Sequence, residues 1–317
     1  MSVKTWLTPI VTERMFSVET LLKERAKAET RRKKEKRSHR VDYFHQVQDP
    51  YSALAAQALK ALCDRYSIEL HCHLVPPPEA SAAPEPDKLT AFSLRDARLL
   101  AKAHGLMEEA FARQPSEEEF ELAQKALCCA LQAEDFTKQA ASISNALWAN
   151  EGSQELLVKF PMADHEATLQ AVQEGTQLRK KQGHYLGATF YYEGEWYWGL
   201  DRLHYLEARL QALGAVKPAV PYKGCYLFDL LLDGPIEPRV QANGPAPVLE
   251  FYFSIRSPYS AIVALRVFEL ARQTGATIDY RFVLPMVMRG LPVPKSKRQY
   301  IVKDTAREAR LYQIPFG

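Results

Sequence analysis

Long apolar runs are missing from this 317-residue chain. The longest, near Cys225–Leu232, is interrupted by Asp229 and is much shorter than the roughly 20 residues that a membrane helix needs. Residues 1–23 contain charged side chains throughout, among them Lys4 and Glu13, so they lack the uninterrupted apolar core of a secretory signal. We therefore expect a cytoplasmic protein with no membrane partner.

Cysteine and net charge are also scarce. The five cysteines, at positions 63, 72, 128, 129 and 225, form no CxxC pair, and their odd number argues against a disulfide framework. The formal net charge is only +3, and most of the excess base lies between Lys23 and Arg40, so we expect no nucleic-acid partner. A hydrophobic content of 47% with 25% charged residues is typical of a globular protein, and the length allows two domains.

The N-terminal extension, residues 1–40, has a helical pattern from residue 17 whose second half is strongly basic. Such a segment can bind a nucleic acid or a membrane surface, or it can be a solvated helix that packs its few apolar residues on the main body. The basic run lacks interleaved aromatic residues, which favours the solvated helix.

Residues 41–213 show a repeating strand and helix pattern that predicts an α/β domain. The order is strand, helix, strand, a helical insertion over residues 90–182, two strands and a closing helix, which is the order of a thioredoxin-like fold with an inserted helical subdomain. The expected strands are 41–46, 68–75, 188–193 and 195–198, and the expected helices include 93–104, 116–133, 135–150, 164–182 and 201–213.

After a proline- and glycine-rich linker, residues 214–247, the pattern begins again. Pro-Tyr-Ser-Ala occurs at 50–53 and again at 258–261, which indicates an internal duplication. Residues 248–317 are therefore predicted to be a second, incomplete thioredoxin-like repeat, with strands, helices and no counterpart of the hairpin and closing helix. Two strands are marginal alone. We expect this lobe to borrow cover from the rest of the chain, or the natural chain to continue past Gly317.

The junction between the first strand and the first helix is where a thioredoxin-like fold places its chemistry. Backbone N–H groups and the helix dipole at that point stabilise an anion such as a thiolate. The two junctions are Asp49-Pro50-Tyr51-Ser52 and Ser257-Pro258-Tyr259-Ser260, so neither forms a dithiol and disulfide exchange from this site is excluded. A serine hydroxyl there can still donate a hydrogen bond to the thiolate of another molecule.

The segment Phe251-Tyr252-Phe253-Ser254-Ile255-Arg256-Ser257-Pro258-Tyr259-Ser260 resembles the opening of the 2-hydroxychromene-2-carboxylate isomerases and kappa-class glutathione transferases, a branch of the DsbA-like family. Further matches to the family's motifs are Lys297-Arg298-Gln299-Tyr300, Asp304, Arg307 and Gln313-Ile314-Pro315-Phe316 in the second copy, and Trp198-Gly199-Leu200-Asp201-Arg202-Leu203 in the first.

The resemblance implies a glutathione-linked isomerase or transferase. It implies Ser257 as the catalytic residue that faces the glutathione sulfur, while the cofactor-binding positions are Asp201, Arg202, Pro258, Tyr259, Lys297 and Tyr300. The partner would be a small aromatic-derived acid or another electrophile, and the chain could form a homodimer. The rival interpretation is a non-catalytic thioredoxin-like binding or scaffold protein, and a DsbA-family oxidoreductase without CxxC is a third.

The first copy departs from the family at two positions. Asp49 stands where the activating serine is expected, and its carboxylate would repel a thiolate. Ala188 stands at the cis-proline position, where a non-proline cis bond costs about 3–4 kcal/mol. We expect the first copy to have lost its site.

Other candidate residues have structural explanations. His71-Cys72-His73 places two imidazoles on one strand face without further ligands, so we expect no metal centre. Cys128-Cys129 lies in an apolar helical stretch, and the aromatic residues of 191–198 fit cross-strand packing. Asp201 and Arg202 fit a helix start as well as a ligand site.

Overall fold

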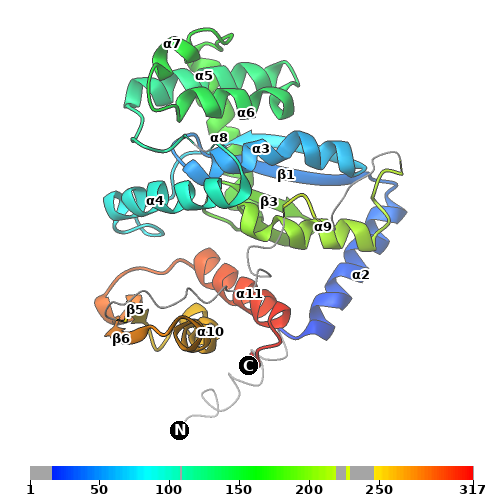
Figure 1. Ribbon diagram of the computed structural model, residues 1–317. Coiled ribbons are helices and arrows are strands. Elements are labelled where there is room, and N and C mark those ends of the chain that lie inside the picture. Colours follow the sequence, from blue (N-terminus) through cyan, green and yellow to red (C-terminus); the bar gives the residue numbers. More distant parts are fainter. Residues whose placement is uncertain (1–15, 108, 219–225, 229–245, 317) are drawn as a thin grey trace. The chain divides into compact units, whose positions relative to one another are not determined.

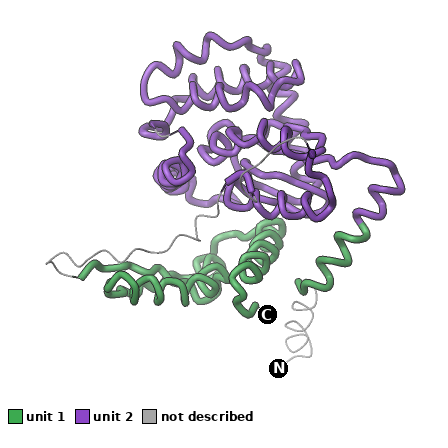
Figure 2. The backbone as a smooth tube through the Cα atoms, turned by 45° about the vertical axis from the view of Figure 1, so that its right-hand side comes forward, with its two compact units in different colours: residues 1–27, 232–317 green, residues 28–231 purple. Residues whose placement is uncertain are grey.

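The computed structural model describes residues 16–107, 109–218, 226–228 and 246–316. By its internal contacts the chain divides into two units, residues 28–231 (unit 2) and residues 1–27 with 232–317 (unit 1), coloured separately in Figure 2. Helix α2 (Val18–Lys34) begins in unit 1 and ends in unit 2. Cys225 and most of the predicted linker lie outside the described residues.

Unit 2 contains a four-stranded mixed sheet with the order β2-β1-β3-β4. Its strands are β1 (His39–His45), β2 (Ile68–Leu74), β3 (Thr189–Tyr192) and β4 (Glu195–Trp198). β1 and β2 are parallel, whereas β3 is antiparallel to both β1 and β4. The prediction that these four segments share one sheet is confirmed, and the mixed α/β architecture is consistent with a thioredoxin-like fold.

The β3–β4 hairpin has a two-residue turn. Both turn residues, Glu193 and Gly194, have positive φ (41° and 90°), which is the backbone that joins two antiparallel strands without disturbing their twist. β3 of the hairpin lies beside β1 with Phe190 opposite Tyr43, so an aromatic pair joins the two central strands of the sheet.

Helices cover both faces of this sheet (Figure 1). α3 (Pro50–Arg65) and α9 (Leu203–Ala212), which follows a 3₁₀ turn (Leu200–Arg202), cover the face that carries Tyr43 and Tyr192. α8 (His165–Gln182) covers the face of Asp42, because the side chain of Gln182 donates to that carboxylate. The alternation of side chains along β1 therefore separates two helix layers.

The helical insertion consists of α4 (Pro86–His104), α5 (Glu117–Gln132), α6 (Phe136–Leu147) and α7 (Ser153–Leu157), and it leads into α8 (Figure 1). A capping box between Ser116 and Glu119 starts α5. α4 begins at Pro86, seven residues before the predicted start at 93, because proline is well suited to the first helical turn. The short α7 was not predicted.

Unit 1 contains a two-stranded parallel sheet of β5 (Val248–Phe253) and β6 (Thr277–Phe282), with α10 (Pro258–Thr274), a 3₁₀ turn (Met286–Arg289) and α11 (Lys295–Leu311). Its strand register repeats that of unit 2. Val248 pairs with Thr277, and His39 pairs with Ile68, each 29 residues further along the chain.

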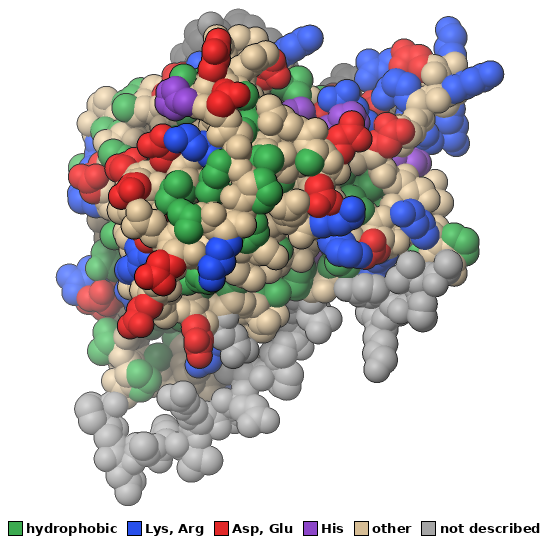
Figure 3. Space-filling view, turned by 90° about the horizontal axis from the view of Figure 1, so that it is seen from above, with side chains coloured by type: hydrophobic (Ala, Val, Ile, Leu, Met, Phe, Trp, Pro, Cys, Tyr) green, Lys and Arg blue, Asp and Glu red, His purple; other side chains and the backbone are tan. Residues whose placement is uncertain are grey.

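The helices in the part of the chain that the structure describes include none long and apolar enough to cross a membrane. The face of the molecule shown in Figure 3 carries acidic and basic side chains intermingled, with Lys and Arg side chains gathered at one corner.

Candidate functional site

In unit 2, β1 leads to the first turn of α3, where Asp49 caps the helix. Its Oδ1 accepts a hydrogen bond from the Tyr51 N–H (3.1 Å), and its Oδ2 accepts one from the Ser52 hydroxyl (3.2 Å). Pro50 occupies the first helical position, where no N–H is needed. The carboxyl of Asp49 is thus occupied by its own helix.

Ser52 joins this helix start to a loop that is distant in sequence. Its Oγ accepts hydrogen bonds from the backbone N–H of Gln46 (3.1 Å) and of Ala188 (2.9 Å). Gly187 allows the close approach, because a Cβ there would lie 2.4 Å from the Cβ of Gln46. Ala188 has a positive φ of 50° and is fully buried, and no peptide bond in the described chain is cis.

The electrostatics of this site disfavour an anion. Burial raises the pKa of Asp49 to about 7, although the Tyr51 and Ser52 hydrogen bonds oppose the shift. Burial also lowers the pKa of His45 to about 3 and raises that of Tyr43 well above its usual value, so both stay neutral. An uncharged environment that makes a carboxyl retain its proton would also disfavour a thiolate.

In unit 1, Ser257 has the position that Asp49 has in unit 2. It is the N-cap of α10, its Oγ accepts from the Ser260 N–H (3.4 Å), and Pro258 is the first helical residue. The Ser260 hydroxyl in turn accepts from the Ser254 N–H (3.3 Å), as that of Ser52 accepts from Gln46. Ser257 is half-buried, and none of the described residues accepts its hydroxyl proton.

A buried carboxylate holds the next residue of this helix start. Tyr259 donates its hydroxyl to Asp304 Oδ2 on α11 (2.8 Å), and the other oxygen of Asp304 accepts from Arg307 (2.6 Å) and Tyr300 (3.4 Å). Unit 2 has the same arrangement in simpler form, since the Tyr51 hydroxyl donates to Asp96 on α4 (2.7 Å). Both tyrosine and aspartate pairs are separated by 45 residues.

The predicted site residues are divided between the units. Ser257, Pro258, Tyr259 and Tyr300 belong to unit 1. Ser257 is the N-cap of α10, and the hydroxyls of Tyr259 and Tyr300 both donate to Asp304. Lys297 lies in the first turn of α11, and burial lowers its pKa.

Asp201 and Arg202 lie in unit 2, in the 3₁₀ turn before α9. Arg202 is the N-cap residue of α9 and makes no side-chain capping hydrogen bond there. These two predicted cofactor-binding residues thus belong to a different unit from Ser257.

Sequence reasoning missed two contacts and one protonation state. It did not find the Ser52 link to Ala188, the pairing of Tyr51 with Asp96, or the raised pKa of Asp49. The Tyr51–Asp96 pair had a sequence signal, since Tyr259 and Asp304 repeat its spacing. The other two depend on contacts and burial that no local pattern shows.

The alternative sites have partners within unit 2. His73 Nε2 lies 3.0 Å from Asp42 Oδ1, and the ring stacks on Phe44. Burial raises the pKa of the Cys72 and Cys128 thiols, which makes them poor nucleophiles. Among the described residues no three His, Cys, Asp or Glu side chains gather in a group that could hold a metal ion.

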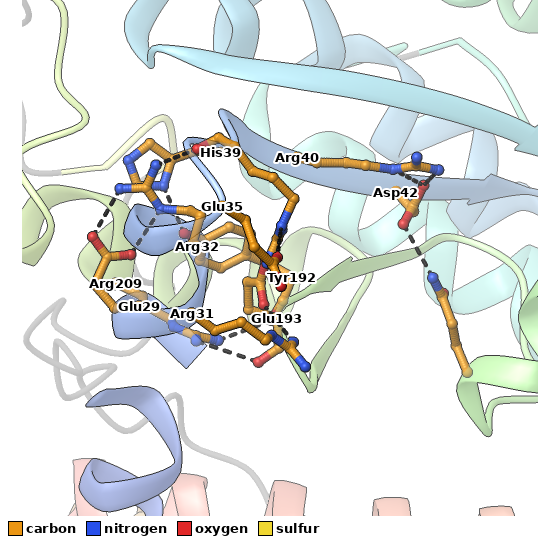
Figure 4. Close-up of polar contacts among 12 residues, drawn as sticks. Glu29, Arg31, Arg32, Glu35, His39, Arg40, Asp42, Tyr192, Glu193 and Arg209 are labelled. Atoms are coloured by element: carbon orange, nitrogen blue, oxygen red, sulfur yellow. Dashed lines mark hydrogen bonds and ion pairs between the residues drawn. The ribbon is translucent and has the colours of Figure 1, made fainter. Parts of the chain in front are cut away.

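The basic end of α2 is matched by acids, as Figure 4 shows. Arg32 makes two hydrogen bonds of 2.8 Å to Glu29, and both Arg31 and Arg37 reach the hairpin residue Glu193 (3.3 and 2.6 Å). Arg37 and Arg31 hold the pKa of Glu193 below its usual value in spite of burial, which raises it. These contacts attach the end of α2 to the β3–β4 hairpin.

No family model and no curated protein matches the chain. The solved structures that resemble it include the following three. A 2-hydroxychromene-2-carboxylate isomerase (HCCA isomerase) is 18% identical over 55% of this chain and 96% of its own, with a TM-score of 0.37. A probable DsbA oxidoreductase from Streptomyces coelicolor is 14% identical over 58% and 94%, with a TM-score of 0.41. The cytosolic disulfide reductase DsbM from Pseudomonas aeruginosa is 16% identical over 55% and 97%, with a TM-score of 0.33.

All three are DsbA-like thioredoxin-fold proteins. The resemblance expected from the sequence motifs is confirmed at this level. The thioredoxin-like fold is seen in the strand order and the helix layers of unit 2.

Proposed function

We propose that the α10 N-terminus binds the thiol of glutathione and that the chain is a glutathione-linked isomerase or transferase. The observation that carries the proposal is the chemistry of Ser257. Its Oγ accepts one long hydrogen bond from its own helix, and its O–H proton has no acceptor among the described residues. A hydroxyl donor at the positive end of a 17-residue helix is suited to a thiolate.

The comparison with the first copy supports the choice of this site. We treat unit 1 as a second, incomplete thioredoxin-like repeat, because its strand register, its Ser260 contact and its Tyr259–Asp304 pair all correspond to those of unit 2. At the one position where the two helix starts differ in charge, unit 2 has Asp49 and unit 1 has Ser257.

The chemistry requires no net oxidation. The thiolate adds to an electrophilic carbon of an unsaturated aromatic-derived acid, so that a C–S bond forms, a C=C bond becomes single, and the electron pair of that bond moves onto the conjugated carbonyl oxygen. Rotation about that single bond follows, and elimination restores the double bond and the thiolate. The role of Ser257 is to donate a hydrogen bond to the sulfur before addition and after elimination.

In this proposal the neighbouring residues bind the rest of the tripeptide. Burial lowers the pKa of Lys297 and so disfavours its charged ammonium form. A carboxylate ligand would stabilise that charged form. Pro258, Tyr259 and Tyr300 shape the helix start. The assignment of Asp201 and Arg202, which lie in unit 2, to the cofactor stays a prediction. The substrate class stays a small aromatic-derived acid or a similar electrophile.

Three substitutions at one position separate binding from capping. Ser257→Ala removes both functions, Ser257→Thr keeps both, and Ser257→Asp keeps a good N-cap but brings a negative charge to the sulfur. We expect calorimetric titration to show glutathione binding to wild type and to Ser257→Thr only. Turnover of a trial substrate should fall on the order of 10- to 1000-fold in Ser257→Ala, whereas Asp49→Ala should change it little.

A non-catalytic binding or scaffold protein is the second candidate, and one observation favours it. The unit with the four-stranded sheet carries a proton-retaining carboxyl in place of the thiolate-facing group. If this candidate is right, Ser257→Ala costs roughly 1 kcal/mol of stability as a lost cap, and neither wild type nor Ser257→Thr binds glutathione. If wild type and Ser257→Thr are both folded and neither binds glutathione, while Ser257→Ala loses only the stability of the cap, the enzyme hypothesis is rejected.

A further inference from the structure

A cavity of about 380 Å³ lies in unit 2 between β2, α5 and α8, three elements distinct from α3 and α10, whose starts form the candidate site. Cys72 and His73 of the His-Cys-His motif belong to its lining. α8 approaches β2 closely at this point, because a Cβ on Gly175 would lie 2.1 Å from the Leu74 carbonyl oxygen. A cavity of this size suits a small organic molecule. Its polar groups therefore decide which class of molecule it takes.

A buried carboxylate fixes the imidazole of His73. Its Nε2 lies 3.0 Å from Asp42 Oδ1, and its ring stacks on Phe44. Arg40 forms an ion pair with the same carboxylate (2.8 Å), as Figure 4 shows, so Asp42 is compensated without a charge on His73. Burial alone would raise the pKa of Asp42, but hydrogen bonds from His73 and Arg40 hold it at about 2. Asp42 is therefore an ionised acceptor, and Nε2 is its donor.

The other nitrogen of the His73 ring is an acceptor for a ligand. The neutral ring with its proton on Nε2 has a lone pair on Nδ1. None of the described residues makes a hydrogen bond to Nδ1, and the side chain, which lines the cavity, is 20% exposed. An imidazole that a carboxylate holds on one side and that is open on the other is the arrangement by which proteins orient a histidine toward a bound group.

Two further acceptors line the cavity from α8. Gln170 and Glu174 lie one turn apart, and the Gln170 amide nitrogen donates to Glu174 Oε1 (2.9 Å). This bond leaves the amide oxygen of Gln170 and the second carboxylate oxygen of Glu174 as acceptors. Glu174 is the only acid among the described residues that line the cavity, and no Lys or Arg of the described chain forms an ion pair with it. The wall therefore carries one uncompensated negative charge.

Much of the remaining wall is apolar. Leu131 of α5 and Ala167 and Ala171 of α8 line it, together with Cys128, whose thiol stays protonated because burial raises its pKa. A metal ion does not fit, since the described chain has no group of three His, Cys, Asp or Glu side chains that could hold one. An anion does not fit either, because the carboxylate of Glu174 would repel it.

We propose that this cavity binds a small primary amine, in its ammonium form, that carries a short apolar chain. An ammonium group has three N–H donors, and the cavity offers three acceptors in His73 Nδ1, the Glu174 carboxylate and the Gln170 amide oxygen. The charge of the ammonium matches the single carboxylate, and the apolar chain contacts the apolar wall. The site does not depend on the thiol proposal, because its residues lie in unit 2 and Ser257 lies in unit 1.

Titration of the full chain with n-butylammonium chloride at pH 8 tests the site, because histidine rings are in general neutral at that pH. The ring signals of isotope-labelled histidine are followed by NMR, and the signal of His73 is identified by its absence from His73→Phe. We expect n-butylammonium to shift this signal. It should bind at least about 10-fold more tightly than butan-1-ol, which lacks the charge, and than butyltrimethylammonium, which lacks the N–H donors. Butyrate, which has the opposite charge, should not bind.

Three variants test the assigned acceptors. Glu174→Gln keeps the shape of an exposed side chain and removes its charge, so the chain should stay folded and bind n-butylammonium about 10- to 100-fold more weakly. Glu166→Gln is the matched control, because it makes the same change at an exposed position of the same helix outside the cavity, and it should bind like wild type. His73→Phe should weaken binding by about 3- to 30-fold. The NMR signals of the ligand measure these affinities, and melting temperatures check that each variant is folded.

Three results would each overturn the proposal. The first is a His73 signal that n-butylammonium does not shift at any millimolar concentration. The second is equal binding of n-butylammonium and butyltrimethylammonium, which would show that the N–H donors are not recognised. The third is an equal effect of Glu174→Gln and Glu166→Gln, which would show that the amine binds outside this cavity.

Discussion

Replacing Asp49 by asparagine should remove a large pH dependence from the stability of unit 2. In the folded chain this half-buried carboxyl accepts hydrogen bonds from the Tyr51 N–H and the Ser52 hydroxyl, yet burial still raises its pKa to about 7. Asparagine has nearly the same shape, but only its one carbonyl oxygen can accept a hydrogen bond. The cost of the lost hydrogen bond, about 1 kcal/mol, does not depend on pH.

The sign and size of the effect follow from linkage. The folded pKa lies above the unfolded value of about 3.9, so the folded chain holds a proton that the unfolded chain releases. This contribution to stability is complete below about pH 4 and is lost as the pH rises through 7. Three pH units correspond to about 4 kcal/mol, and partial exposure of Asp49 reduces the expected loss to about 2–4 kcal/mol.

Urea unfolding between pH 4 and pH 8, followed by the fluorescence of Trp148, Trp196 and Trp198, measures this directly because all three lie in unit 2. The stability of Asp49→Asn relative to wild type should rise by about 2–4 kcal/mol across that range. Asp49→Ser, which gives this helix start the sequence of the second one, should behave in the same way. An unchanged difference between variant and wild type at pH 4 and pH 8 would refute the reasoning.

Two further predictions concern the fold. Ala188→Pro should destabilise unit 2 by more than about 3 kcal/mol, because φ is 50° there and the N–H donates to Ser52. Ala188→Gly allows that φ and should destabilise it clearly less. Urea unfolding midpoints compare the two variants, and equal midpoints would contradict this explanation. An isolated fragment 248–317 should be digested by protease faster than the same residues in the whole chain, because a two-stranded sheet is marginal alone, and equal resistance would show that the lobe is self-sufficient.

The strand and helix order of unit 2 could be predicted from the sequence because its signals are local. Alternating apolar residues mark β1, and Glu193-Gly194 marks the hairpin turn, so the four strands were found within a few residues of their ends. The start of α4 was placed too late, because the proline-rich segment before it was interpreted as loop throughout. Proline at Pro86 begins the helix instead.

The candidate site was predictable only in its residue types. The sequence shows that Asp49 and Ser257 occupy equivalent helix starts, and chemistry then predicts which of them suits a thiolate. It does not show that Asp49 keeps its proton near neutral pH, because that shift is caused by burial, which depends on packing across the whole unit.

Sequence alone therefore determined the elements, their order and the motif that repeats at 50–53 and 258–261, since these depend on neighbouring residues. Tertiary structure decided the rest. Ser52 meets Ala188 across 136 residues, and Tyr259 meets Asp304 across 45. Among the described residues β5 pairs with β6 alone, although its sequence resembles that of a central strand. Contacts of this kind arise only when distant segments pack, and no local pattern encodes which segments those are.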